Sequence, residues 1–420
     1  MTDAELEEKA IRIQAVVEEK VLQAHGMLPM LVRADDYQLP SEEDYRGAYR
    51  HRHLLGKTET EIGIAPMHVW RAWENTPTDT AWYLGAMSYR YRCTGDPDIL
   101  EICRRTLGAL KYIHALGVEK GERGYMCKPY GGVYSNQSSG DQVQCILVGL
   151  AAYRPIAPPE DLAAIDEILV DMAEFDIRWN YVSPHGYFGY THESLVESIL
   201  GKNWINASWS YAIIHTPLLY LAWQATGDPK FLGEIERWYE ACDTGMRFER
   251  PTGKLTGGLG WRELYLPALL MTFDPPHHAL WRSMMLWRYD MLRTGVLEDG
   301  TAAYQWTCDM DSGERELLPA TLWGAGPART GRSGIFARAC VAAQPWFQDE
   351  DMASTARHIL EHLDLDTFRF IMPLEEDQVV PAAWEVETRL LDMDSLTGWL
   401  WAYWEGRWRG YWQADGQVGQ

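Results

Sequence analysis

Apolar residues recur at the spacing of an amphipathic helix over most of this chain. Val143, Ile146 and Leu150 stand at positions i, i+3 and i+7, and the segments 264–271 and 278–292 follow the same pattern. The strict alternation of apolar and polar residues that marks a half-buried strand is scarce. The pattern therefore predicts an all-α protein.

A repeated motif divides part of the chain into helical hairpins. The tetrapeptide Thr-Gly-Asp-Pro occurs at 94–97 and at 226–229, inside the similar stretches 87–117 and 219–245. Glycine ends one helix in left-handed geometry and Asp-Pro opens the next, so each stretch predicts two helices joined by a tight turn. A fainter third copy spans 342–364.

Hairpins of this kind cannot bury their apolar faces alone and must pack against one another. No fixed short period persists, and long connections rich in aromatic residues and glycine separate the hairpins, which favours a closed toroid over an open solenoid. No Pro/Ser-rich linker or abrupt change in composition interrupts the chain. We therefore expect one domain that spans 1–420.

Composition and charge restrict the class of partner. Hydrophobic residues make up 46% of the chain, enough for a large core, and the net charge of −22 repels phosphate backbones and anionic membrane surfaces. Residues 1–20 form a charged amphipathic segment rather than a signal peptide, and no stretch reaches the ~18 apolar residues of a membrane span. We expect a cytoplasmic protein that binds neither nucleic acid nor a membrane.

The sequence carries no motif for a metal or a cofactor. Its 7 cysteines are scattered without C-x-x-C spacing, which favours buried thiols over disulfides or zinc. His277 and His278 are adjacent and would face apart on a helix. The Gly-rich stretch 323–334 lacks the Gly-Lys-Ser/Thr ending of a phosphate loop. We expect no metal and no cofactor.

Two acidic residues stand at the expected openings of apolar helices. Asp141 opens one such helix, where Ser139 and Gln142 have the spacing of a capping box, and Asp79 holds the same place in the segment 73–91. In a ring of helical hairpins the inner helices present their N-terminal ends to the same side, so we expect both carboxyl groups to reach one pocket. The alternative is that the helix dipole alone favours an acid in a first turn, by ~0.3–1 kcal/mol.

The order of these motifs resembles that of the unsaturated glucuronyl and rhamnogalacturonyl hydrolases. The resemblance covers about residues 79–240 and lies in the runs 79–84, 94–97, 139–142, 149–150, 204–223 and 226–229. Those enzymes are six-hairpin (α/α)6 toroids among the glycoside hydrolases, and they use one aspartate at each of the first two helix openings. The resemblance implies that Asp141 is the general acid and base and that Asp79 is its charged partner.

The sequence departs from that family at one place. The family carries a sugar-gripping Arg-Gly-Gln-Ala-Trp run just before the helix that here starts near Trp209, whereas this chain reads Asn-Trp-Ile-Asn-Ala-Ser-Trp at 203–209. The substrate is therefore either an unsaturated uronic acid or an intact one, as for a β-glucuronidase-like hydrolase. In both cases the expected partner is an oligosaccharide.

A dense group of aromatic and hydrogen-bonding residues between 179 and 209 predicts a sugar-binding wall. With one aromatic residue before the Asp79 helix and two arginines suited to hold a carboxylate, the candidate substrate-binding residues are Trp73, His185, Tyr190, His192, Glu193, Asn203, Trp204, Trp209, Arg329 and Arg332. The alternatives are a packed loop with structural histidines, and arginines that are solvated or ion-paired. Further acids at 384–387 and 392–394 are expected to be solvated or paired with arginine.

Three other functions stay open at this point. A polysaccharide lyase on the same toroid would use Tyr190 or His192 as its base, and Asn203 or an arginine to neutralise the uronate carboxylate. A sugar epimerase would use paired histidines such as His185 and His278. The third is a non-catalytic carbohydrate-binding toroid. The 20 Trp and 22 Tyr suit packing and stacking, and the same surface would also suit a homo-oligomer interface.

Overall fold

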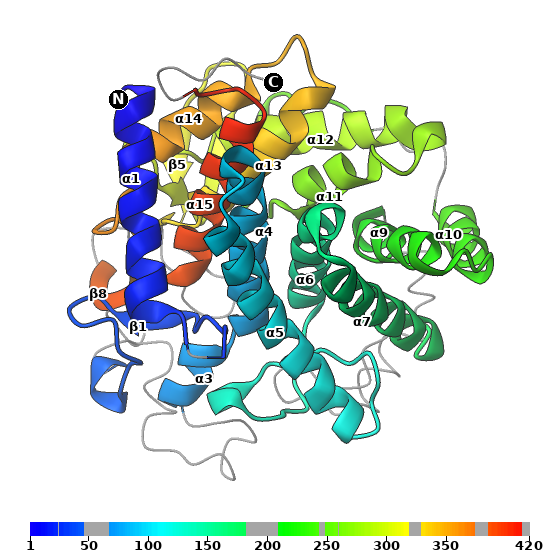
Figure 1. The fold of residues 1–420 in the computed structure, drawn as a ribbon. Helices are drawn as coiled ribbons and strands as arrows, with labels where there is room; N and C mark the ends of the chain where they lie inside the picture. Colours follow the sequence, from blue (N-terminus) through cyan, green and yellow to red (C-terminus); the bar gives the residue numbers. More distant parts are fainter. Residues whose placement is uncertain are drawn as a thin grey trace.

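Six inner helices close into a ring (Figure 1). The structure is a computed structural model that describes residues 1–23, 25–45, 67–181, 209–242, 248–258, 260–318, 329–373 and 385–413. Within these ranges each inner helix packs against the next, and the last packs against the first. In chain order the inner helices are α4 (Thr76–Thr94), α6 (Gly140–Tyr153), α9 (Trp209–Thr226), α11 (Arg262–Leu270), α13 (Ser333–Ala343) and α15 (Met393–Trp408).

A second layer of helices surrounds the ring. Most inner helices lead through a tight turn into the outer helix that follows, while the outer neighbour of α15 comes from the N-terminus of the chain. The outer helices are α1 (Asp3–Val16), α5 (Pro97–Glu119), α7 (Pro159–Arg178), α10 (Lys230–Ala241), α12 (His278–Arg293) and α14 (Met352–His362). The expected all-α, (α/α)6 toroid is confirmed.

The repeated turns have the geometry that the motif predicts. Gly95 ends α4 with a φ of 65°, and the side chain of Asp96 accepts a hydrogen bond from the backbone of the next helix. Gly227 has a φ of 70°, and Asp228 accepts from the Lys230 amide at 3.0 Å. Glycine adopts this left-handed conformation without steric cost, which is why it ends both inner helices.

Short strands, which the sequence pattern did not reveal, occupy the long connections that lead into the inner helices. They form three antiparallel sheets within the described ranges. One is β1 (Leu31–Arg33), β8 (Glu385–Asp392) and β7 (Arg369–Pro373); the second is β2 (Lys254–Gly258), β4 (Gln305–Asp309) and β5 (Arg315–Leu317); the third is β3 (Ala302–Ala303) with β6 (Arg329–Thr330). Most are too short for period-2 alternation to be visible. A further helix, α3 (Met67–Trp73), precedes α4.

Tryptophan serves the core of this toroid. The largest fully buried side chains include Trp70, Trp82, Trp238, Trp281, Trp306, Trp399, Trp401 and Trp404. Trp82 of α4 packs against Trp401 of α15, whereas Trp399 of α15 faces the outer layer and donates to the Leu360 backbone oxygen in α14. Among the described helices, none combines the length and the apolar composition that a membrane span requires.

Glycine lets neighbouring inner helices approach closely. A Cβ atom added at Gly149 of α6 would lie 2.4 Å from the backbone oxygen of Ala81 in α4. Between α13 and α15, a Cβ at Gly334 of α13 would lie 2.5 Å from the backbone oxygen of Ser395 in α15. Backbone atoms cannot move aside as a flexible side chain can, so these two contacts fix the spacing of four inner helices.

Replacing Gly149 by alanine should therefore destabilise the toroid. Overpacking of a close contact costs about 1–3 kcal/mol, which exceeds the gain in helix propensity from Gly to Ala of about 1 kcal/mol. Gly233→Ala in the outer helix α10 is the matched control, since nothing lies within 4 Å of its added Cβ. Urea unfolding should show a loss for Gly149→Ala and no loss for Gly233→Ala. Equal stability of the two variants would contradict the close packing of α4 on α6.

Candidate functional site

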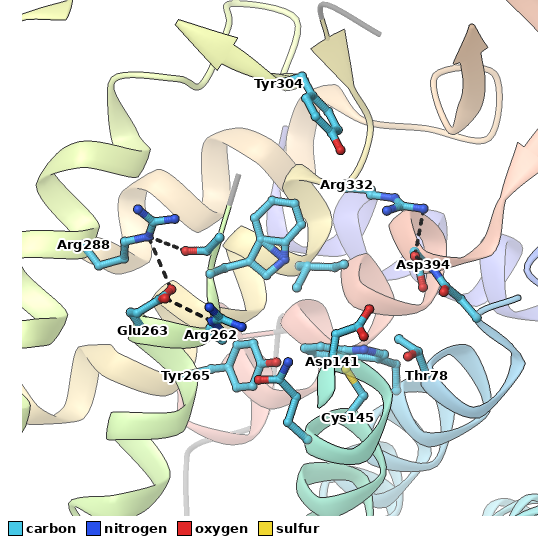
Figure 2. A pocket seen from close by; sticks show the side chains of 16 residues that line it. Thr78, Asp141, Cys145, Arg262, Glu263, Tyr265, Arg288, Tyr304, Arg332 and Asp394 are labelled. Atoms are coloured by element: carbon cyan, nitrogen blue, oxygen red, sulfur yellow. Dashed lines mark hydrogen bonds and ion pairs between the residues drawn. The ribbon is translucent and has the colours of Figure 1, made fainter. Parts of the chain in front are cut away.

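A pocket of about 510 Å³ opens where the inner helices begin. Five of the six inner helices contribute to it from their N-terminal ends (Figure 2). The lining residues are Asn75, Thr78 and Trp82 at α4; Asp141, Gln144 and Cys145 at α6; Gly260, Trp261, Arg262, Glu263 and Tyr265 at α11; Arg288 from α12; Tyr304 between β3 and β4; Arg332 and Ile335 at α13; and Asp394 at α15.

Three pocket acids share one position in their helices. Asp141, Glu263 and Asp394 are each the second residue of an inner helix, α6, α11 and α15 respectively. The partial positive charge of a helix N-terminus favours a carboxylate there. Their surroundings nevertheless differ, and that difference decides what each can do.

Glu263 is held by two arginines on one side of the pocket. Arg262 Nε lies 3.0 Å from one carboxylate oxygen, and Arg288 Nε lies 3.6 Å from the other. Arg288 also donates to the backbone oxygens of Gly258 and Gly260, which anchors it to the end of β2. Burial lowers the pKa of Arg288, but an arginine keeps its charge in proteins. Glu263 is therefore an ion-paired carboxylate.

Asp394 is held on the opposite side. Its Oδ2 accepts a hydrogen bond from Asn75 Nδ2 at 2.7 Å and pairs with Arg332 Nη2 at 3.0 Å. Arg332 Nε also pairs with Asp392 at 3.0 Å. Burial opposes the charge of Arg332, yet the carboxylates of Asp392 and Asp394 outweigh it and raise the arginine's pKa. Of the two interpretations of Arg332 from the sequence, the structure supports the ion-paired arginine, and it confirms that the acids at 392 and 394 pair with arginine.

Asp141 lies between these two groups (Figure 2). It is exposed to the pocket and makes no hydrogen bond or ion pair within the described ranges. Its neighbours Cys145 and Tyr265 are neutral. Burial raises the pKa of Cys145 to about 12, and it raises the pKa of Tyr265 well above its usual range. Of the three pocket acids, Asp141 is thus the one whose carboxyl group is accessible to a ligand and not held by an arginine within the described ranges.

The floor of the pocket is aromatic and rests on a buried cation. Trp82 packs edge-on against Tyr265 and Trp401, with ring centroids 5.5 and 5.1 Å apart. The guanidinium of Arg338 lies beneath, 4.2 Å from the centroid of Trp401 and 5.1 Å from that of Trp82. Its ion pair with Glu405 is long, at 3.9 Å, and burial lowers the pKa of Arg338. Cation–π contacts therefore carry much of its stabilisation.

Asp79 lies behind the pocket rather than on its surface. It is the fourth residue of α4, fully buried, while its neighbour Thr78 faces the pocket. Burial, and then the charges of Asp394 and Asp392, raise its pKa well above the usual range. The structure thus differs from the expectation that both carboxyl groups reach one pocket, because successive helical residues point about 100° apart. A charged Asp79 is also disfavoured in this place.

The other predicted binding residues do not gather at the described part of the pocket. Trp73 is buried at the end of α3 and is not one of the lining residues. His278 hydrogen-bonds the Met271 backbone oxygen at 2.8 Å and lies outside the pocket lining. Trp209 is the first residue of α9, and Arg329 is the first residue of β6. Outside the described residues lie His185, Tyr190, His192, Glu193, Asn203 and Trp204.

The expected capping box at α6 is replaced by a bridge between helices. Ser139 precedes the helix, but its side chain does not cap it. The Gln142 amide instead donates to the backbone oxygen of Glu74 and to Asn75 Oδ1, the latter at 3.3 Å. Because Gln142 is buried between α6 and the start of α4, the interhelical partners outcompete the local one. The capping-box prediction was wrong.

Several pocket residues escaped the sequence analysis. Trp261, Arg262 and Glu263 directly precede the apolar segment 264–271, whose periodicity predicts a helix but not its exact start. Asp394 is one of several acids near the C-terminus, and the sequence pattern does not distinguish it from the others. The signal that Glu263 and Asp394 share with Asp141 is an acid at the second position of an apolar helix.

The fold is shared with enzymes of known structure. An unsaturated glucuronyl hydrolase specific for heparin superposes with a TM-score of 0.52 at 13% identity, over 99% of each chain. A variant of the unsaturated glucuronyl hydrolase from Streptococcus agalactiae gives 0.50 at 12% identity, over 100% of this chain and 93% of that one. A cellobiose 2-epimerase from Bacillus thermoamylovorans gives 0.48 at 13% identity, over 96% and 100%.

The distant structural relationship to the unsaturated glucuronyl hydrolases is thereby confirmed. At this level of identity it establishes the (α/α)6 fold. No protein-family model matches the sequence, and no curated protein matches it either. Among the described residues, no group of three or more His, Cys, Asp and Glu side chains is arranged to hold a metal ion.

The raised pKa of Asp79 predicts a pH-dependent stability. Above about pH 4, the usual pKa of an aspartate, the folded protein keeps a proton on Asp79 that the unfolded chain releases. Stability therefore falls as pH rises toward the folded pKa, by up to about 1.4 kcal/mol per pH unit. In Asp79→Asn this contribution disappears, so the difference in urea midpoint between pH 5 and pH 8 should shrink.

Asp290→Asn is the matched control for that measurement. Asp290 is also buried, but its carboxylate pairs with Arg250 and Arg293, which keep their charge between pH 5 and pH 8. This variant should lose stability and keep the wild-type pH dependence. If Asp79→Asn keeps the wild-type pH dependence as well, Asp79 is not the protonated group.

Proposed function

We propose that this protein is a glycoside hydrolase that acts on an oligosaccharide containing uronic acid, with Asp141 as the general acid and base. One observation carries the proposal. Within the described chain, Asp141 is the pocket carboxyl group without an ion pair, whereas Glu263 and Asp394 are both held by arginine. A group that must take up and release a proton is best left without a permanent cation.

The lining supports an acidic sugar as the substrate. Three arginines border the described pocket of a chain whose net charge is −22. The planar guanidinium fork matches a carboxylate in geometry and charge. The half-buried ring of Trp261 offers flat apolar surface for the face of a sugar ring. The volume, about 510 Å³, is in the usual range of small-ligand pockets.

The proposed reaction needs one carboxyl group that alternates between its protonated and its ionised form. Protonated Asp141 donates its proton to the glycosidic oxygen, or to the double bond of an unsaturated uronic acid, as positive charge develops on the sugar ring. The resulting carboxylate then takes a proton from the water that adds to the sugar, which restores the protonated acid. Neutral Cys145 and Tyr265 beside Asp141 place no competing charge next to it.

Asp141→Asn should abolish turnover while leaving the fold intact. Loss of a general acid and base lowers kcat by about 100- to 10,000-fold. The assay offers disaccharides with saturated and with unsaturated uronic acid at the non-reducing end, and follows reducing ends and ultraviolet absorbance together. Loss of absorbance from the unsaturated sugars, absent in the variant, supports a hydrolase that acts on unsaturated substrates; reducing ends alone indicate an ordinary uronidase.

Asp98→Asn is the matched control, because Asp98 is also a first-turn acid but lies exposed on the outer helix α5. Its turnover should equal that of the wild type. Rising absorbance would identify a lyase instead. Full activity of Asp141→Asn would rule out the assigned role. Binding of the sugars without turnover would mean a carbohydrate-binding toroid.

A further inference from the structure

Three carboxyl groups and one guanidinium meet where α4, α13 and α15 begin. Asp394 lines the pocket, Asp392 caps α15 behind it, and Arg332 pairs with both at 3.0 Å. Asp79 of α4 is the third carboxyl group, and its pKa responds to all three of these neighbours. All three acids are almost completely shielded from solvent.

Some of the buried carboxyl oxygens in this cluster lack a hydrogen-bond donor among the described residues. Neither oxygen of Asp79 has a conventional hydrogen-bond donor among the described residues, and Asp394 Oδ1 also has none. By contrast, the equally buried Asp274 accepts from Tyr239 at 2.9 Å and from Trp281 at 2.8 Å. A buried carboxylate without donors is expensive. A proton between Asp79 and Asp394 would satisfy both residues at once.

The charge balance points to the same place for that proton. Fully ionised, the three acids and Arg332 would carry a net charge of −2 in a buried cluster, which is strongly unfavourable. Arg332 forms ion pairs with Asp392 and Asp394, whereas both carboxyl oxygens of Asp79 lack a donor among the described residues. Just before α4, Glu74 pairs with Arg71 and Lys128, and Asp141 of α6 lines the same pocket as Asp394. The proton therefore belongs on Asp79, the acid of the three that has no arginine partner among the described residues.

We infer that Asp394 is a second substrate-contacting carboxylate of this pocket, and that Asp79 is a positioning residue that donates a hydrogen bond from its protonated carboxyl to Asp394. This inference rests on the proposed hydrolase function. The ionised Asp394 accepts a hydrogen bond from a hydroxyl group of the sugar that is bound at Asp141. Asp79, Asn75 and Arg332 hold its orientation from behind. The role differs from the charged partner that the sequence resemblance implies for Asp79.

Paired substitutions separate the two roles. Asp394→Asn removes the charge that faces the sugar and should lower kcat/KM by about 10- to 100-fold, the worth of a hydrogen bond to a charged group. Asp79→Asn keeps a donor toward Asp394, so kcat should fall by less than about tenfold. Asp79→Leu removes the donor, so the kcat/KM of this variant should lie between those of Asp79→Asn and Asp394→Asn. Thermal unfolding of each variant shows whether the fold is retained.

Infrared spectroscopy gives a readout that needs no turnover. At neutral pH the wild type should show the carbonyl band of a protonated carboxylic acid, and the difference spectrum against Asp79→Asn should assign that band to Asp79. The band should persist in the Asp290→Asn control. A merely structural role of Asp79 would not require such a band.

Two results would overturn the inference. One is an Asp79→Asn variant as inactive as Asp141→Asn with no loss of a protonated-carboxyl band, which would make Asp79 a charged group at the substrate. The other is an Asp394→Asn variant with wild-type kcat/KM. If the wild type neither turns over nor binds the disaccharides, as judged by tryptophan fluorescence, the proposed function fails and the sugar contact of Asp394 with it. The infrared band would still decide whether Asp79 holds the proton.

Discussion

A short hydrogen-bond chain through Asn75 holds the pocket end of the toroid together. Asn75 accepts from Gln142 of α6 and donates to Asp394 of α15, which in turn pairs with Arg332 before α13. Four inner helices are thus linked by polar contacts at the end where the pocket opens. Such buried networks are strong when complete and costly when broken. The residues that close the ring also shape the site, so neither can change without the other.

Burying these charged groups lowers the free energy of unfolding, and groups in direct contact with them offset part of that loss. Arg332 neutralises two carboxylates, and a proton on Asp79 removes a third negative charge. Deeper in the ring, the guanidinium of Arg338 lies among the rings of Trp82, Tyr265 and Trp401 and forms an ion pair of 3.9 Å with Glu405. An apolar core of the same shape would avoid these desolvation costs. Their concentration beneath one pocket is what a functional site would require.

The hairpins were predictable because their signals are local. A Gly followed by Asp-Pro determines a helix end and a helix start within four residues, and both copies at 94–97 and 226–229 behave as expected. The pocket was only partly predictable, because its residues converge from distant segments. Arg288 reaches the pocket from an outer helix. The Gln142 side chain does not complete a capping box at its own helix but donates to partners 67 and 68 residues away. Sequence spacing does not report such tertiary competition.

The position of each acid within its helix explains why Asp79, Asp141 and Asp394 have different surroundings. Asp141 and Asp394 are second residues of their helices and face the pocket, whereas Asp79 is two positions further along α4. Two residues turn a helix by about 200°, enough to move a carboxyl group from the pocket surface to the space between helices. There it meets Asp394 from behind and retains a proton. The same residue type at nearly the same helix opening is thus exposed to the pocket in one place and buried between helices in another.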